Sequence, residues 1–250
     1  MKTAYFDCFS GISGNMIIGA FLDAGLPLEY LQNELAKLTI SDVYELVTEP
    51  VQKLGIGACH FDVRLPHHAH HGHDDHDHHH HRNLQDIVKL VEQSVLAPEV
   101  KDLSLQIFTR LGEAEAKVHN CSVAEVHFHE VGAVDALIDI VGAAVGCHYF
   151  GIERICASSL HVGSGLVKCS HGFLPIPAPA TAELLKGVPF YSTEIKGELV
   201  TPTGAAIITT LASEFGPIPP LRVDAIGYGA GTWDLTIPNV VRLYLGNTQD

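Results

Sequence analysis

The chain has 250 residues, 46% of them apolar and only 18% charged, which excludes a wholly disordered protein and allows one substantial core or two small ones. Its 29 acidic and 15 basic residues give a formal net charge of −14, which argues against a nucleic-acid partner and suits a protein that handles cations. The sequence has no apolar run of membrane-spanning length, no N-terminal signal peptide and no C-x-x-C pair among its six cysteines. We therefore expect a cytoplasmic protein with no membrane partner and no disulfide framework.

Apolar periodicity and capping signals predict the elements of the first half of the chain. Asn83 is a candidate N-cap, and Gly25 and Pro27 end one helix and begin the next. In chain order we expect a strand at 3–9, a tight turn at 11–14, helices at 15–25 and 27–38, a strand at 61–65, and helices at 84–95 and 98–118.

The second half mixes the two kinds of element. We expect a helix at 132–150, strands at 153–158, 160–163 and 166–169, helices at 178–186 and 203–215, and strands at 221–226 and 240–245. Without strict βαβ alternation, this order predicts an α+β fold with a mixed α/β sheet and packed helices. We expect one globular metal-handling domain over residues 1–250, interrupted by an insertion at 67–81.

The insertion holds ten of the chain's 17 histidines in fifteen residues, with Asp74, Asp75 and Asp77 among them. No core can be built from this composition, so we expect a disordered loop. Neutral imidazole is the usual protein ligand for nickel, zinc and copper. The alternatives are a purification tag, which the internal position disfavours, and low-complexity drift without a role. The predicted metal ligands are His67, His68, His70, His71, His73, His76, His78, His79, His80 and His81.

A second group of polar residues lies in the segment VHFHEVGAVDALID. His127 and His129 are two apart and point to the same side of an extended segment, whereas Asp135 and Asp139 share one face of a helix. We predict the two histidines as metal ligands, and Glu130 and Asp135 as a catalytic base or its partner. Alternatively, Asp135 only stabilises the start of the helix and Glu130 is a surface charge.

The opening FDCFSGISGNM places Asp7 at the end of a strand and Ser13 at a helix N-terminus, whose amides can bind a phosphate or a carboxylate. The segment lacks the lysine of a Walker loop and the spacing of a dinucleotide fingerprint, so a plain tight turn is equally favoured. Asp7 is a catalytic candidate and Ser13 a binding candidate.

Several glycine- and threonine-rich segments follow in the C-terminal half. Lys168 and His171 come after GSG, Thr201 or Thr203 can cap a helix, and GYGAG at 227–231 is typical of a loop. Each segment suggests backbone that closely approaches a ligand or another part of the chain. The four side chains are candidate binding residues, with turn formation and capping as the alternatives.

In this order, the segments DCFSGISGNM, the histidine-rich insertion, VHFHEVGAVDALIDIVG, HGFLPIPAPATAELLKG, ELVTPTGAA and GYGAG resemble the nickel insertion proteins LarC over nearly the whole chain. The resemblance implies a CTP-dependent nickel insertase of the lyase type. Such an enzyme forms nickel–sulfur and nickel–carbon bonds on pyridinium-3,5-bisthiocarboxylic acid mononucleotide, which yields the nickel-pincer cofactor of lactate racemase.

The resemblance further implies that CTP and Mg²⁺ or Mn²⁺ bind a C-terminal portion of the family that this chain lacks. That portion, lactate racemase and further copies of the chain are the expected partners. On this basis the insertion collects nickel, and His127 and His129 hold or relay it. Glu130 or Asp135 then takes the ring proton. Two alternatives stay open: a non-enzymatic nickel store or chaperone, and a phosphotransfer enzyme built on the GISG and TPTG loops, which the missing Walker lysine disfavours.

Overall fold

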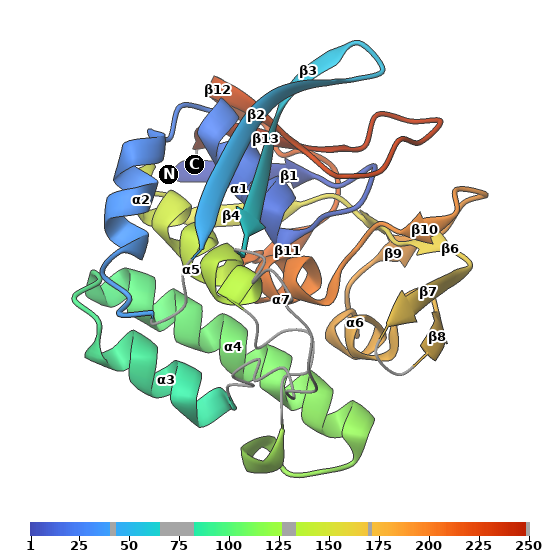
Figure 1. Cartoon of the computed structure of the whole chain (residues 1–250). Coiled ribbons are helices and arrows are strands. Elements are labelled where there is room, and N and C mark those ends of the chain that lie inside the picture. The colour runs from blue at the N-terminus through green and yellow to red at the C-terminus, as the bar shows by residue number, and fades with distance from the viewer. Residues whose placement is uncertain (41–43, 66–82, 127–133, 170–171, 249–250) are drawn as a thin grey trace, which may run out of the picture.

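A seven-stranded sheet with helices packed against it forms the centre of the molecule (Figure 1). The structure is a computed structural model, which describes residues 1–40, 44–65, 83–126, 134–169 and 172–248. Within these ranges, no helix has the length and apolarity needed to cross a membrane.

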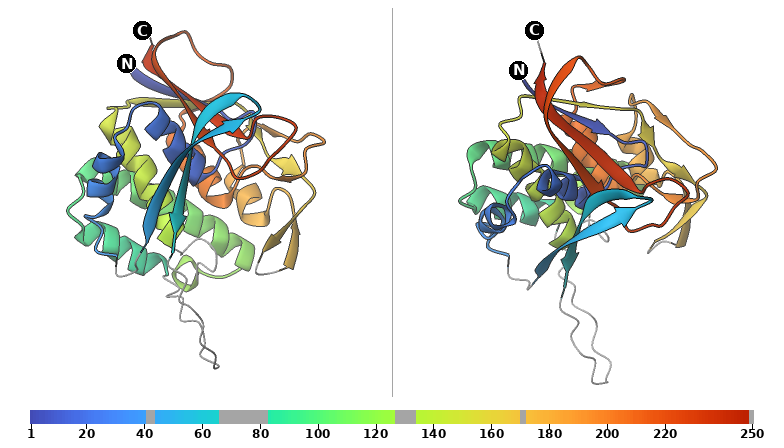
Figure 2. Two further views of the ribbon diagram at one scale, coloured as in Figure 1. Left: turned by 45° about the horizontal axis from the view of Figure 1, so that its top comes forward. Right: turned by 90° about the horizontal axis from the view of Figure 1, so that it is seen from above.

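The sheet contains both parallel and antiparallel pairs, so the predicted mixed α+β fold is confirmed. Its strand order is β11-β4-β1-β13-β12-β3-β2, and β1 pairs in parallel with β4 but antiparallel with β13. The pairing of β1 with β13 brings the two termini side by side, as Figure 2 shows. The strands are β1 (Lys2–Asp7), β2 (Glu45–Lys53), β3 (Ile56–Arg64), β4 (Arg154–Ala157), β11 (Glu214–Phe215), β12 (Leu221–Ala230) and β13 (Val240–Thr248).

The helices begin where the sequence places capping residues. The side chains of Ser13, Asn83 and Thr201 each accept a hydrogen bond from a backbone N–H in the first turn of the helix that follows, which confirms Asn83 and Thr201 as N-caps. The helices are α1 (Gly14–Asp23), α2 (Leu28–Leu35), α3 (Leu84–Gln93), α4 (Pro98–His119), the short 3₁₀ helix η1 (Val123–Glu125), α5 (Val134–Tyr149), α6 (Pro179–Leu184) and α7 (Pro202–Leu211).

Three pairs of short strands flank α6 at one side of the molecule, to the right in Figure 1. They are β5 (Leu160–His161) with β9 (Phe190–Tyr191), β6 (Gly163–Ser164) with β10 (Gly197–Glu198), and β7 (Leu166–Cys169) with β8 (Gly172–Pro175).

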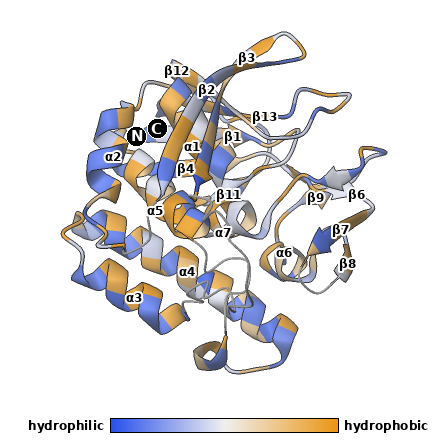
Figure 3. Cartoon of the chain, in the orientation of Figure 1, coloured by the Kyte–Doolittle hydropathy of each residue, from blue (hydrophilic) through white to orange (hydrophobic). Residues whose placement is uncertain are grey.

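One large cluster of buried apolar side chains joins the sheet to the helices. Helix α1 contacts β3, β12 and β13, α5 packs on α1, α4 packs on α5, and α3 packs on α4. In Figure 3 hydrophobic and hydrophilic residues alternate along α3 and α4, as expected for helices with one buried face. Helix α5 is buried along almost its whole length, which fixes the position of the polar residues at its start.

Some predicted boundaries are wrong. The helix expected over 203–215 ends at Leu211, and β11 follows it. Strand β2 was not predicted, because its charged residues and Pro50 do not alternate with apolar ones; the sheet accommodates them because β2 is an edge strand.

The segment GYGAG is not a loop, because β12 continues to Ala230. Its glycines allow a close approach by α1, since a Cβ at Gly229 would lie 1.7 Å from the carbonyl oxygen of Met16. The segment therefore approaches another part of the chain, one of the two alternatives that the sequence left open.

Candidate functional site

A cavity of about 180 Å³ lies where α1 and α7 begin, beside β3 and the loop between β12 and β13. We call it the polar cavity, because its walls carry hydroxyl, amide, imidazole and carboxylate groups. These groups belong to Ser13, Asn15, His60, Asp62, Glu198, Thr201, Thr232 and Asn239, with the indole of Trp233 beside them.

Two helix N-termini meet at the polar cavity. The N–H of Ile12 donates to the carbonyl of Leu199 (2.8 Å), and the N–H of Thr201 donates to the carbonyl of Ile12 (3.2 Å), so the segments before α1 and α7 are joined. The capping hydroxyls of Ser13 and Thr201 lie at this junction. Because helix N-termini carry partial positive charge, this side of the cavity favours an anionic or electron-rich group.

The opposite walls are held by hydrogen bonds of two asparagines. Asn15 Nδ2 donates to the carbonyl of Phe61 (3.2 Å) and so fixes the end of β3 against α1. The buried Asn239 accepts from the N–H of Trp233 (3.1 Å), while Lys53 Nζ donates to the carbonyl of Trp233 (3.1 Å). The loop that carries the tryptophan is therefore fixed at both of its backbone polar groups.

Three carboxyl groups interact at the end of β3 and the start of α5. Asp135, in the first turn of α5, is accessible to solvent, but partial desolvation by the surrounding fold and the negative charge of Asp62 raise its pKa. Burial raises the pKa of Asp139 well above its ordinary value, and the charges of Asp135 and Asp62 add to the effect. Asp62 thus connects the polar cavity electrostatically to α5.

Asp139 is the most unusual of these groups. Its side chain is buried within the apolar face of α5, and its Oδ1 has no hydrogen-bond partner among the described residues. The carboxyl packs against the first residue of α1, because a Cβ at Gly14 would lie 2.3 Å from Asp139 Oδ2. The surroundings favour the neutral form of this carboxyl group, because an unpaired charge here would have lost its hydration without compensation.

The structure brings some predicted site residues together and separates others. Ser13 and Thr201 both line the polar cavity, whereas Thr203 lies in the first turn of α7 and does not line it. Lys168 lies on β7, in the group of short strands. Asp7 forms an ion pair with Arg242 across the β1–β13 ladder (2.5 Å), which gives its carboxylate a structural partner.

Several predicted residues fall outside the part of the chain that the structure describes. They are Glu130, His127, His129, His171 and the ten histidines of the insertion. Among the described residues, no group of three or more His, Cys, Asp or Glu side chains is close enough to hold a metal ion. All six cysteines are free thiols.

Sequence reasoning missed most of the walls of the polar cavity. His60 and Asp62 stand in HFD, four residues before the histidine-rich insertion, and Trp233 is the only tryptophan of the chain. The HFD motif and the single tryptophan could have been singled out from the sequence, but nothing in the sequence indicates that either of them lies near Glu198.

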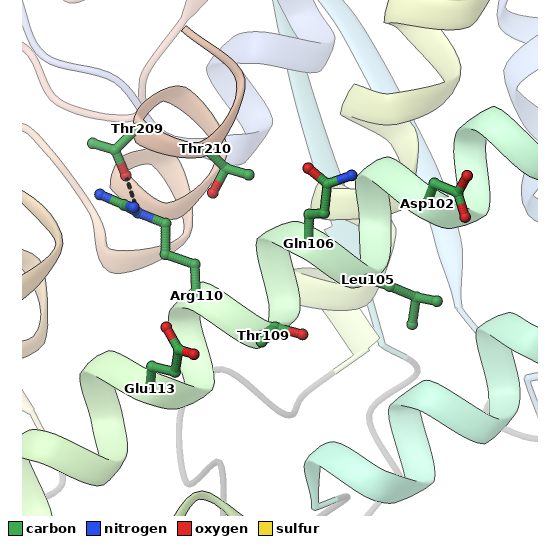
Figure 4. Close-up of a pocket in the computed structure, with 8 residues that line it drawn as sticks. All are labelled: Asp102, Leu105, Gln106, Thr109, Arg110, Glu113, Thr209 and Thr210. Atoms are coloured by element: carbon green, nitrogen blue, oxygen red, sulfur yellow. Dashed lines mark hydrogen bonds between the residues drawn. The ribbon is translucent and has the colours of Figure 1, made fainter. Parts of the chain in front are cut away.

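A larger and more open groove lies on the outer side of α4 (Figure 4). It measures about 520 Å³, and we call it the α4 groove; it is lined by Asp102, Leu105, Gln106, Thr109, Arg110 and Glu113 of α4 with Thr209 and Thr210 of α7. Arg110 donates to Thr209 Oγ1 (3.0 Å) and to the carbonyl of Leu184 (3.2 Å), so its guanidinium joins α4 to α7 and α6.

Comparison with known proteins gives a family match over nearly the whole chain. Residues 4–250 match the family model described as nickel insertion protein. A protein of Desulfitobacterium hafniense (strain DSM 10664 / DCB-2) is 54% identical over 250 residues, which cover 100% of this chain and 60% of that protein. A protein of Clostridium kluyveri is 48% identical over 251 residues, which cover 100% of this chain and 63% of that protein.

Both of these relatives are named pyridinium-3,5-bisthiocarboxylic acid mononucleotide nickel insertion protein. The chain thus spans about 60% of the length of the curated relatives that it matches. No solved structure matches it.

Proposed function

The chain belongs to the nickel insertion protein family, and from this premise we propose that it delivers nickel to a pyridinium bisthiocarboxylate mononucleotide at the polar cavity. The observation that supports the proposal is that Asp62 of this cavity and Asp135 of α5 are close enough for their charges to interact. In the sequence, Asp62 comes five residues before the insertion at 67–81, and Asp135 comes two residues after the segment 127–133. The charge of Asp62 raises the pKa of Asp135, so a described residue near each histidine-bearing segment in the sequence belongs to one electrostatic group.

The chemistry at this place follows from the donor types. Imidazoles of the insertion collect nickel(II), and His127 and His129 pass it to the acceptor, because neutral imidazole binds this ion well and can release it by exchange. Formation of a nickel–carbon bond requires the ring C–H to lose its proton to a base. Asp135 and Glu130 are the proposed bases, and Asp62 joins them because it faces the cavity.

The raised pKa of Asp135 suits the role of base, because a carboxylate with a higher pKa binds a proton more strongly. In the proposed sequence of events, nickel accepts the electron pair of the ring carbon as the proton passes to the carboxylate. The thiocarboxylate sulfurs complete the bonds to nickel without further loss of protons.

Ser13 and Thr201 are the proposed contacts for a carboxylate or phosphate oxygen of the acceptor, since both hydroxyls lie at helix N-termini in the cavity. Lys168, His171 and Thr203 remain proposed phosphate contacts from residue type alone. Asp7 remains a catalytic proposal from its position at the end of β1, although its ion pair with Arg242 explains it structurally.

A triphosphate does not fit the polar cavity, whose described lining includes Asp62 and Glu198 but no lysine or arginine. We therefore assign CTP and its Mg²⁺ or Mn²⁺ to the part of the longer relatives that this chain does not span, and derive no step through them. We also propose that the protein is a lyase, that it is cytoplasmic and that it assembles into a homo-oligomer. The cofactor that it helps to make is proposed to be that of lactate racemase.

The first test measures nickel transfer to the mononucleotide by this chain together with the C-terminal part of a relative. We expect Asp135→Asn to lower the rate by about 100-fold or more, the usual contribution of a general base. Asp102→Asn, a carboxylate on the α4 groove, is the matched control and leaves the rate unchanged. Equal rates for the two variants would remove Asp135 from the mechanism.

The second candidate function, a nickel store, is favoured by the histidine content of the insertion alone. Deletion of residues 67–81 separates the two. A store loses nearly all of its bound nickel and has no transfer activity to lose, whereas an insertase keeps transferring nickel when the ion is plentiful. Transfer that survives deletion but disappears in His127→Ala, His129→Ala supports the insertase with a relay at these two positions.

A further inference from the structure

The β12–β13 ladder has two faces with different surroundings. Leu243 belongs to the large apolar cluster, and at its partner Gly227 a Cβ would lie 2.0 Å from the carbonyl oxygen of Ala20, so this face packs against α1. Successive residues of a strand point to opposite faces, so Arg242 and Tyr244 point away from α1. We call that second surface the open face; it consists of Val223, Ile226, Tyr228, Arg242 and Tyr244.

The residues of the open face are neighbours across the ladder. Ile226 lies opposite Tyr244, and Tyr228 lies opposite Arg242. Val223 is 39% exposed and Ile226 is 43% exposed, while the two tyrosines are half-buried. The water-facing side of an antiparallel sheet is ordinarily polar, whereas apolar, tyrosine and arginine side chains together are typical of the centre of a protein–protein interface.

The chain itself covers the neighbouring part of the same face. Tyr5 of β1 lies next to Tyr244 in the sheet, with 6.3 Å between the ring centroids. Only 5% of Tyr5 is exposed, and its hydroxyl donates to the carbonyl of Gly216, in the loop between β11 and β12 (2.9 Å). This loop therefore covers β1, whereas Val223 and Ile226 on β12 remain exposed.

The side chains of the open face are fixed before any partner arrives. Arg242 forms its ion pair with Asp7, and its guanidinium carbon lies 5.0 Å from the centroid of the Tyr244 ring. Side chains that are already held in place lose little conformational entropy when a partner binds. The open face is thus a preformed contact surface.

The longer relatives supply a candidate for the partner. This chain corresponds to their N-terminal part, which is 60% of the Desulfitobacterium hafniense protein. In that relative the polypeptide continues beyond the region that matches β13. Tyr244 lies four residues before Thr248, where β13 ends, so the continuing chain leaves the sheet beside the open face.

From the apolar and aromatic side chains, the partial cover and the position beside the end of β13, we infer that the open face is the docking surface for the C-terminal part of the longer relatives. The inference goes beyond the proposed function, which assigns CTP to that part but no contact surface to it. It depends on membership of the family and not on nickel transfer.

A second copy of the chain is the less favoured occupant. Two copies with a formal net charge of −14 each repel one another, and a stable dimer of separate chains buries roughly 1,200–2,000 Å². A part of the same polypeptide has an effective concentration of about millimolar, so a small patch of apolar side chains is enough to dock it.

The test measures the accessibility of side chains by hydroxyl-radical oxidation and mass spectrometry. It compares this chain alone with this chain continued by the C-terminal part of the D. hafniense relative. We expect the oxidation of Tyr228 and Tyr244 to fall by about three-fold or more in the longer protein, because docking excludes water from aromatic residues at the centre of an interface. Phe173, which is 69% exposed on β8, should be oxidised equally in both proteins.

A charged residue on the open face should prevent docking. In the longer protein, Ile226→Glu should return the oxidation rate of Tyr244 to that of the chain alone, because docking would bury an unpaired carboxylate. Val95→Glu, which changes a 76% exposed apolar residue between α3 and α4, is the matched control and should leave the protection intact. Circular dichroism checks the folding of each variant, and Val223→Glu replaces Ile226→Glu if that variant does not fold.

Four results would overturn the inference. They are equal oxidation of Tyr244 in the two proteins, equal loss of protection in Val95→Glu, protection of Phe173 in place of Tyr244, and protection in the chain alone that increases with its concentration. The last result would assign the open face to a second copy.

Nickel transfer by the longer protein separates the inference from the proposed function. Protected tyrosines without nickel transfer would support the docking surface and overturn the function. Normal nickel transfer without protection of Tyr244 would overturn the docking surface and leave the function standing.

Discussion

The polar cavity and the α4 groove differ in the origin of their walls. The groove has almost three times the volume of the cavity, yet most of its lining comes from successive turns of one helix (Figure 4). The cavity is small, but its polar groups come from four segments that lie far apart in the sequence. A groove of this kind forms along any helix whose neighbouring helix does not cover its surface. Polar groups from separate segments come together in one cavity only when the whole chain has folded. For this reason we propose the smaller polar cavity, and not the larger groove, as the functional site.

The largest difference between the two regions should appear in activity. We expect Asp62→Asn to lower nickel transfer by about 100-fold or more, because the variant removes a carboxylate that lines the polar cavity and that we propose as a base. Glu113→Gln, which removes a carboxyl group from the α4 groove, should stay within about two-fold of the wild type. Single-turnover transfer assays on both variants measure this contrast, and a reversed order would mean that the groove is the working site.

The second difference concerns the stability of the fold. Arg110→Met keeps the aliphatic part of the side chain but loses the bonds to Thr209 and to the carbonyl of Leu184. We expect the free energy of unfolding to fall by about 1–2 kcal/mol, a typical value for partly exposed hydrogen bonds of a charged donor, while nickel transfer by the folded protein is unchanged. Urea unfolding provides the measurement. Unchanged stability combined with lost transfer would assign the groove a functional role.

The third difference is a dependence of stability on pH beside the polar cavity. Because burial raises the pKa of Asp139, the folded chain retains a proton that the unfolded chain releases above its ordinary pKa of about 3.9. The free energy of unfolding therefore falls as pH rises from that value toward the folded-state pKa, by up to about 1.4 kcal/mol per pH unit. Below both pKa values the group contributes no such dependence.

Asp139→Asn removes this titration and nearly preserves the shape of the side chain. The variant should therefore gain stability relative to the wild type as pH rises from 4 toward neutrality, and Asp102→Asn, on the exposed side of α4, should not. Urea unfolding at several pH values compares the three proteins. Parallel curves for the wild type and Asp139→Asn would show that Asp139 titrates normally.

Local signals in the sequence predicted much of the fold. Asn83 and Thr201 cap helices as expected, because a cap depends only on residues within about one turn. Strand β2 could not be predicted from the sequence, because a strand with charged residues and Pro50 is tolerated only at the edge of a sheet. Its position at the edge is known only once the other strands of the sheet are in place. The glycine-rich end of β12 was interpreted as a loop. Helix α1, whose close approach requires these glycines, is about two hundred residues away in the chain, so the local sequence gives no sign of it.

The sequence by itself determined the class of fold, the family and the positions of the capping residues, since these depend on short motifs and on periodicity. Only the tertiary structure decided that Asp62, Glu198 and Trp233 share one cavity, and that Asp7 has Arg242 as its partner. The physical reason is that caps and turns form between neighbours along the chain. The cavity, in contrast, exists only after β3, α1, α7 and the loop after β12 have packed around one core.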